Sequence, residues 1–235
     1  MRKITVAIIA ILVGAVVVIA GQSWLEKQKW YEGVAKIDEW AISEGNEYDG
    51  GIGDLLIGNK DAKVKIIEYA DFQCSACALT FPYLHEVVEE FGDEVAYVYR
   101  TYAINYHQNA TAAATAAVAA YKQGYFEDFA LEIFAKQDEW FYSEGEERDK
   151  QFESYFMKAS GDHGNIDQYR EDLKSKAIKD KIAVDHELAT RLKLTGTPLI
   201  YINKEKFELE STKESEIKQK FKNRINAALE AANKE

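Results

Sequence analysis

The first twenty residues contain the longest apolar run of the chain. It extends from Ile4 to Ala20, and Arg2 and Lys3 precede it. As a helix this run is about 26 Å long at roughly 1.5 Å per residue, which just suffices to cross a hydrocarbon core about 30 Å thick. The basic flank should remain in the cytoplasm, so the rest of the chain is predicted to lie outside. A signal peptide cut before Gly21 is the alternative, and it exports the same residues.

Beyond this run the hydrophobic pattern divides the chain further. Residues 23–44 mix tryptophans with charges and predict a juxtamembrane helix, and the glycine-rich stretch 45–53 predicts a linker. We therefore expect a membrane anchor or signal segment at 1–23, a helix and linker at 24–53, and one folded domain at 54–235.

Within the folded domain, segments whose hydrophobic residues recur at every second position alternate with segments in which they recur at about every fourth position. Strands are expected at 63–70 and 94–101, with a helix between them that begins near Cys74 and ends by Gly92. The next helices are predicted at 109–123, 125–136, 148–159, 166–175 and 177–194. Two short strands at 198–202 and 206–210 and a last helix from about Lys213 complete the pattern. This order predicts an α/β sheet interrupted by a helical insertion.

Composition supports a globular domain and excludes some partners. Hydrophobic residues make up 47% of the chain and charged residues 29%, which provides material for a core. The formal charge of −11 lacks the basic footprint of a nucleic-acid-binding protein. It also argues against tight binding to anionic lipid headgroups.

Only two cysteines occur in the chain, Cys74 and Cys77. A disulfide-stabilised scaffold needs more of them at wider spacing, so this pair indicates chemistry. The pair follows a strand and opens a helix, where unpaired N–H groups and the macrodipole favour a thiolate at Cys74. Cys77 lies one helical turn later and can close a disulfide or resolve a mixed disulfide.

Zinc binding is the competing explanation for such a pair, and structural zinc usually needs four ligands. The histidines of the chain form no second paired motif; they are His85, His107, His163 and His186. A purely structural Cys74–Cys77 bridge would close too small a loop to restrain the unfolded chain much. We therefore expect neither a metal nor another cofactor.

A single charge interrupts the strand before the cysteines. Alternation places Glu68 on the same side as its apolar neighbours, which are Val64, Ile66, Ala70 and Phe72. A buried carboxylate beneath the cysteines could exchange a proton with Cys77, because burial raises its pKa. A solvated strand residue is the alternative.

The two prolines stand at special places. Pro82 lies five residues after Cys77 and should kink the cysteine helix. Pro198 follows Thr197 at the start of a strand, where proline is allowed. The sequence alone favours the trans form of the Thr197–Pro198 bond.

These features together resemble the DsbA-like branch of the thioredoxin superfamily, from about Asp54 to the C-terminus. The motifs that carry the likeness are VKIIEYADFQCSAC, VAYVYR, HQNATAAATAAVAAYKQGYFEDF and RLKLTGTPLIYIN. The resemblance implies a thioredoxin fold with an inserted helical domain at about 105–193. It also implies a cis Thr197–Pro198 bond that faces the disulfide, with Thr197 and Pro198 as substrate-binding residues.

The resemblance further implies roles and partners. Cys74 would be the attacking thiolate and Glu68 the buried proton carrier. By analogy, the substrates are exported proteins with free thiols, and a quinone-linked membrane partner reoxidises the enzyme. The domain would stand outside the cytoplasm, tethered by one membrane-spanning segment or secreted after cleavage.

The chain departs from the family pattern between its cysteines. Strongly oxidising members often carry histidine just before the second cysteine, whereas Ser75 and Ala76 stand here. Neither adds a charge that would stabilise the thiolate, so we expect a weaker oxidant than the family's namesake. His107 matches a common histidine position, but Gln108 replaces the proline that usually follows, and we interpret His107 as a helix-start residue.

Three functions remain open from the sequence. The leading hypothesis is an oxidase that donates its disulfide to client proteins. A reductase or isomerase on the same fold differs only in redox poise, which the sequence does not specify. A membrane-anchored chaperone or binding module without catalysis is the third.

Overall fold

The computed structural model describes residues 2–161 and 163–234, with the backbone alone at 2–11 and 13. Contacts divide the chain into two units, residues 1–39 and 40–235. The helices are α1 Arg2–Val34, α2 Ser75–Phe91, α3 Ala110–Tyr121, α4 Phe126–Ala135, α5 Gln137–Trp140, α6 Gly145–Ala159, α7 Ile166–Asp172, α8 Lys176–Arg191 and α9 Glu214–Ala232. The strands are β1 Leu55–Gly58, β2 Val64–Ala70, β3 Val95–Thr101, β4 Leu199–Ile202 and β5 Glu205–Phe207.

The first unit consists mainly of α1, a single helix over Arg2–Val34. Most of the apolar run expected to cross the membrane has side chains outside the described residues. In the part of the chain that the structure describes, no helix is both long and apolar enough to cross a membrane.

The juxtamembrane helix expected at 23–44 is too long, because α1 ends at Val34. At the start of the second unit, polar side chains stabilise turns where the helix was expected to continue. Asp49 accepts hydrogen bonds from the Asn46 backbone N–H at 2.7 Å and from the Ser43 hydroxyl at 2.9 Å. Short polar side chains of this kind compete with helical hydrogen bonds and favour turns.

The second unit is built on a five-stranded sheet in the order β1-β3-β2-β4-β5. The central strands β2 and β3 run parallel and place Glu68 beside Tyr99, and the other pairings are antiparallel. The sequence pattern did not predict β1. Its four residues follow the glycine-rich linker, and only its pairing with β3 establishes it as a strand.

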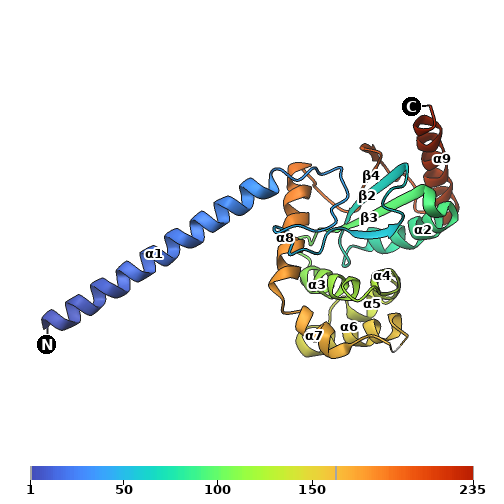
Figure 1. The fold of residues 1–235 in the computed structure, drawn as a ribbon. Helices are drawn as coiled ribbons and strands as arrows, with labels where there is room; N and C mark the ends of the chain where they lie inside the picture. The colour runs from blue at the N-terminus through green and yellow to red at the C-terminus, as the bar shows by residue number, and fades with distance from the viewer. Residues whose placement is uncertain (1, 162, 235) are drawn as a thin grey trace. The chain divides into compact units, whose positions relative to one another are not determined.

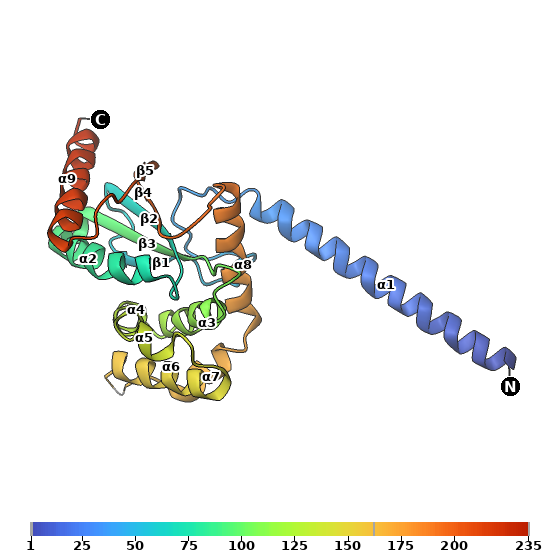
Figure 2. The ribbon, with the colours of Figure 1, turned by 180° about the vertical axis from the view of Figure 1, so that it is seen from behind.

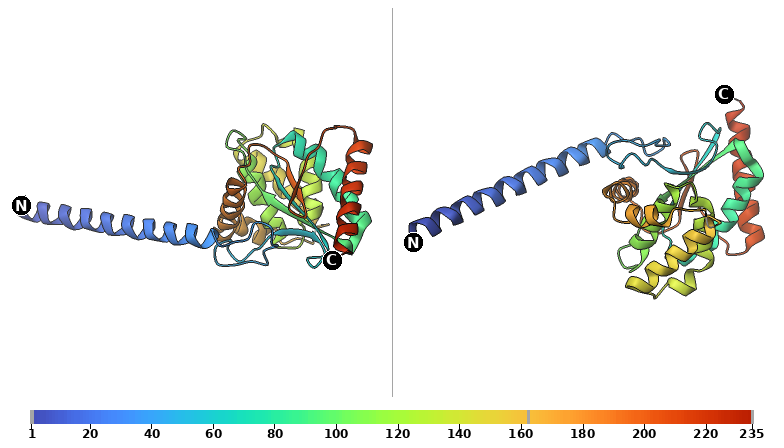
Figure 3. Two further views of the ribbon diagram at one scale, coloured as in Figure 1. Left: turned by 90° about the horizontal axis from the view of Figure 1, so that it is seen from above. Right: turned by 60° about the horizontal axis from the view of Figure 1, so that its bottom comes forward.

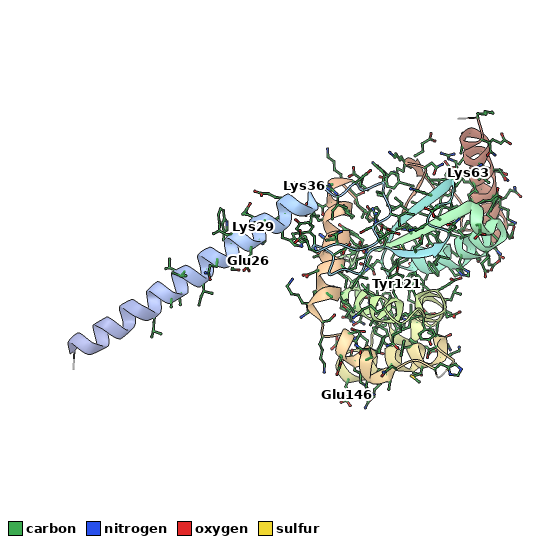
Figure 4. The ribbon with its side chains drawn as sticks, in the orientation of Figure 1. Glu26, Lys29, Lys36, Lys63, Tyr121 and Glu146 are labelled. Atoms are coloured by element: carbon green, nitrogen blue, oxygen red, sulfur yellow. The ribbon has the colours of Figure 1, made fainter. Side chains whose placement is uncertain are left out.

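Two helices cover one side of the sheet. Helix α2 packs beside α9, while α8 lies on the opposite side, as Figures 1, 2 and 3 show. The four-residue spacing expected in the last helix is confirmed by its buried residues, among them Ile217, Phe221 and Ile225. Lys63, just before β2, donates to Asn233 Oδ1 at 2.6 Å (Figure 4). This hydrogen bond connects the C-terminal end of α9 to the sheet.

Helices α3 to α8 form the expected helical insertion between β3 and β4, which confirms the α/β sheet with an insertion. The alanine-rich helix α3 is buried along most of its length, because small side chains allow close helix packing. Trp140 at the end of α5 is fully buried, and its indole N–H donates to the Ile133 carbonyl at 2.8 Å.

A group of four buried charges lies where β3 meets α8. We call Asp54, Arg100, Lys181 and Asp185 the paired charge cluster; none is more than 2% exposed. Arg100 donates twice to Asp54, at 3.0 and 2.8 Å, and Lys181 bridges Asp54 at 3.0 Å and Asp185 at 2.7 Å. Burial alone would raise the pKa of Asp54, but the two cations outweigh it and lower that pKa.

Candidate active site

Both cysteines lie at the N-terminus of α2, where the sequence predicted them. Cys74 is the residue before the helix, in extended conformation, and Cys77 is fully buried in the first turn. Asp71 shapes the turn that leads into the pair: its carbonyl accepts the Cys74 N–H at 3.0 Å and its carboxylate accepts the Gln73 N–H at 2.7 Å. Cys74 is therefore the more accessible sulfur, and Cys77 lies behind it.

The two thiols have opposite electrostatic environments. The hydrogen bond from Cys77 is the main cause that lowers the pKa of Cys74 to about 5, and backbone N–H groups of Ala76 and Cys77 add to it. Burial raises the pKa of Cys77 well above its usual value, and the charge at Cys74 raises it further. At neutral pH Cys74 is a thiolate and Cys77 a thiol, although Ser75 and Ala76 contribute no charge.

Glu68 lies beneath the pair on β2 and is fully buried. Burial raises its pKa to about 7, the charge at Cys74 raises it as well, and a hydrogen bond from the Tyr97 hydroxyl opposes both. The interpretation of Glu68 as a solvated strand residue is wrong, because its side chain faces the interior. A carboxyl group in this condition can take up or release a proton near pH 7.

The Thr197–Pro198 bond is cis, as the resemblance implied and against the default for the sequence. Its loop lies against the cysteines: the Cys74 sulfur lies 3.4 Å from the Thr197 carbonyl oxygen, which accepts a hydrogen bond from Cys74 only in its protonated form. A cavity of about 580 Å³ extends from this point between α2, the loop before Pro198 and the stretch after β5. Among its lining residues are Ala76, Leu79, Thr195, Pro198, Phe207 and Leu209.

The contacts of two amide side chains near the cysteines were not predicted from the sequence. Gln73 accepts the Asn109 N–H at 2.7 Å and donates to the Phe141 carbonyl at 2.9 Å. Gln137 donates to the carbonyls of Phe72 at 2.7 Å and Cys74 at 3.2 Å. These bonds attach the active-site turn to the insertion, and only the position of Gln73 beside Cys74 hints at this role in the sequence.

His107 lies just before α3 and bonds Asp71 through Nδ1 at 2.8 Å. Its contact is with the turn before the cysteines, so it holds that turn in place.

A group of potential metal ligands lies away from the cysteines. Within the described residues, His85, Glu89 and Glu127 have ligand atoms within 4.8 Å of one another, and this group lies between α2 and α4 and includes neither cysteine.

Comparison with known proteins gives a consistent result. A family model described as Thioredoxin matches residues 51–222. The probable disulfide bond formation protein D of Bacillus anthracis is 30% identical over 168 residues, 68% of this chain and 74% of the relative. The crystal structure of Wolbachia pipientis alpha-DsbA1 superposes with a TM-score of 0.59 at 26% identity, covering 76% of this chain and 92% of that one.

A second group of relatives consists of longer proteins. The Na(+)/H(+) antiporter NhaA 1 of Mycolicibacterium gilvum is 31% identical over 153 residues, 64% of this chain. The chain spans only 23% of the length of that relative. The shared part therefore corresponds to one segment of a larger protein.

Proposed function

We propose that this chain, which belongs to the DsbA-like thiol–disulfide oxidoreductases of the thioredoxin superfamily, exchanges disulfides with exported proteins through Cys74 and Cys77. The observation that carries the proposal is the thiolate at the start of α2. Cys74 has a pKa lowered to about 5 and lies against the cis Thr197–Pro198 loop. A low thiol pKa keeps the sulfur in its reactive thiolate form at neutral pH and makes it a good leaving group.

The exchange begins with attack by a client thiolate on Cys74 Sγ of the Cys74–Cys77 disulfide. The bond between the two enzyme sulfurs breaks, a client–Cys74 mixed disulfide forms, and Cys77 leaves with the electron pair. Glu68 gives its proton to the Cys77 sulfur, which the high pKa of Cys77 favours.

The second step releases the oxidised client. Another client thiolate attacks the client sulfur of the mixed disulfide, and Cys74 leaves as a thiolate that its surroundings already stabilise. The client has then lost two electrons and gained a disulfide, and the enzyme pair is reduced. Thr197 and Pro198 line the place where the client backbone would pair during both steps.

The direction of electron flow follows from the same thiolate. Stabilising Cys74 in its reduced form raises the reduction potential of the pair. We therefore favour an oxidase over the reductase or isomerase alternative. Its strength should exceed that of thioredoxin and fall below that of the family's namesake, because Ser75 and Ala76 add no positive charge between the cysteines.

The cellular setting is proposed from the sequence alone. Arg2, Lys3 and the apolar run from Ile4 to Ala20 indicate export, with the domain tethered outside the cytoplasm and reoxidised by a membrane redox partner. Intact mass of the protein extracted from membranes tests the tether. A species that begins at Gly21 would replace the anchor by a cleaved signal peptide.

Cys74→Ser is the decisive variant for the activity. It should abolish oxidation of a reduced client peptide, because the accessible nucleophile is gone. Cys77→Ser is the matched control: it keeps the Cys74 thiolate and should accumulate a mixed disulfide with glutathione, visible by mass. Client oxidation that survives in Cys74→Ser would exclude the enzyme and leave the chaperone or binding module.

A further inference from the structure

Two polar oxygens near Cys77 stand out by their lack of partners. Among the described residues, Glu68 Oε1 and the Tyr99 hydroxyl are buried and form no hydrogen bond. The other carboxylate oxygen of Glu68 accepts the Tyr97 hydroxyl. Buried polar groups are nearly always paired, so two unpaired ones at neighbouring positions of β2 and β3 point to a role during turnover.

The strand register brings these side chains together. Glu68 on β2 is the direct neighbour of Tyr99 on β3, and Tyr97 lies two residues earlier on the same face. Phe81 of α2 packs against both tyrosine rings, with centroids 6.0 Å from Tyr97 and 5.7 Å from Tyr99. Both phenol rings therefore pack against α2 on the face of the sheet that carries Glu68.

We propose that Tyr97 and Tyr99 are positioning residues for the proton of Cys77: Tyr97 holds the Glu68 carboxylate, and Tyr99 donates to whichever of Glu68 and Cys77 carries the negative charge. This inference rests on the proposed exchange reaction and extends it to the means by which the buried proton is controlled. When Cys77 leaves the disulfide, the proton moves from Glu68 to sulfur, and the charge that appears on Glu68 receives a hydroxyl donor.

Given the groups around Glu68, the phenol hydroxyls of Tyr97 and Tyr99 are the hydrogen-bond donors that can serve Glu68 or Cys77. At the N-terminus of α2 the titratable neighbours are Cys74, just before the helix, and Cys77, and both act on Tyr99, as does Asp71 in the preceding turn. Tyr97 is influenced mainly by burial and then by Glu68.

The other elements packed around Glu68 contribute apolar side chains, or their charged side chains bond other partners. Ile200 of β4 is the other register neighbour of Glu68, and the buried side chains of α9 are apolar. Arg100, next along β3, donates to Asp54 of the paired charge cluster and to the Tyr69 hydroxyl.

Replacing each phenol by phenylalanine removes the hydroxyl and keeps the ring packing. Tyr97→Phe should raise the pKa of Glu68, because the lost hydrogen bond is the one that lowers it. A hydrogen bond to a charged group corresponds to a shift of about one pH unit or more. Tyr99→Phe should slow departure of Cys77 about fivefold, the size of one modest hydrogen bond.

The experiment uses the full chain with carbon-13 in its glutamate carboxyl groups. NMR titration of the reduced protein follows Glu68 directly, with Glu68→Gln to assign the signal. The pH profile of reaction with a reduced client peptide gives the kinetic readout. Tyr169→Phe is the matched control, since its hydroxyl is also buried and unpaired among the described residues but lies in the insertion.

We expect an upward shift of the Glu68 titration in Tyr97→Phe and none in Tyr169→Phe. Once Glu68 is Gln, Tyr97→Phe should no longer affect the kinetics, whereas Tyr99→Phe should still slow departure of Cys77. Folding is checked by the thermal unfolding midpoint. An unchanged Glu68 titration and pH profile in folded Tyr97→Phe and Tyr99→Phe would overturn the proposal. Failure of the proposed function appears differently: no client oxidation at any pH, while the NMR titration still reports on Glu68.

Discussion

The central strands bury polar groups at two places, and the two are organised in opposite ways. In the paired charge cluster, two cations meet two carboxylates, and every member has a partner of opposite charge. Beneath the cysteines a lone carboxylate, Glu68, has one hydroxyl donor and an unpaired oxygen in the described part of the chain. The first arrangement keeps Asp54 ionised, although burial raises the pKa of Asp185 in spite of its pairing with Lys181. The second leaves a proton able to move near neutral pH.

The difference shows that burial alone does not make a titratable group functional. Pairing lowers the pKa of Asp54 in spite of burial, so Asp54 stays ionised. Burial opposed only by Tyr97 raises the pKa of Glu68 to about 7. Asp54 can therefore stabilise the fold throughout the physiological pH range, and Glu68 can exchange a proton during the reaction.

Breaking the paired charge cluster should have the largest effect on stability. Arg100→Leu leaves Asp54 with one cation fewer in the interior, and removal of one partner from a buried pair typically costs about 3–5 kcal/mol. Urea unfolding at pH 7 measures it.

Arg170→Leu is the matched control for Arg100→Leu, because Arg170 is half exposed and pairs with Glu153. Such surface pairs contribute about 0–1 kcal/mol. Equal losses in the two variants would contradict the distinction between the two sites, as would a shifted pH profile of exchange in Arg100→Leu.

Glu68→Gln should change the pH dependence of stability in the reduced protein. The folded pKa of about 7 exceeds the usual glutamate pKa of 4.5, so the folded state binds more protons between these two pH values. Stability then falls as pH rises from about 4.5 to 7, by about 3 kcal/mol in total.

The variant lacks this loss, so its advantage over the natural protein should grow across the same range. Unfolding free energies at pH 5, 6, 7 and 8 measure the trend. Glu94→Gln, an exposed substitution just before β3, is the control and should run parallel to the natural protein. Parallel curves for Glu68→Gln would mean that Glu68 titrates normally.

The smallest perturbation is a titration without mutation. Thiolate absorbance of the reduced protein should rise once near pH 5, for Cys74, while Cys77 stays protonated well beyond. Because the folded pKa of Cys74 is depressed, its ionisation stabilises the reduced fold as pH rises from about 5 to 9. A single rise near pH 9 would contradict the electrostatic difference between the two sulfurs.

Local sequence patterns predicted the positions of Cys74 and Glu68 better than they predicted the contacts around these residues. Spacing predicted Cys74 at a helix start, and alternation favoured an inward-facing Glu68 over a solvated one, because both predictions depend on neighbours in sequence. The paired charge cluster escaped prediction, since Arg100 and Lys181 are far apart in the chain and resemble ordinary surface charges. Strand β1 and the amide contacts of Gln73 and Gln137 depend likewise on long-range packing.

Some information about the missed elements was present in the sequence. Arg100 ends an otherwise apolar strand, and Lys181 and Asp185 stand four residues apart on one helical face. Each observation fits an exposed position equally well, and only the fold brings them together. Tyr97 and Tyr99 alternate on the strand after the cysteine helix, but their relation to Glu68 needed the parallel register.

The reduction potential of the Cys74–Cys77 pair distinguishes an oxidase from a reductase. Equilibration of the purified protein with a series of glutathione buffers, followed by thiol quantification, gives its value. The stabilised Cys74 thiolate predicts a potential well above the roughly −270 mV of thioredoxin. A potential at or below that of thioredoxin would contradict the oxidase and favour the reductase on the same fold.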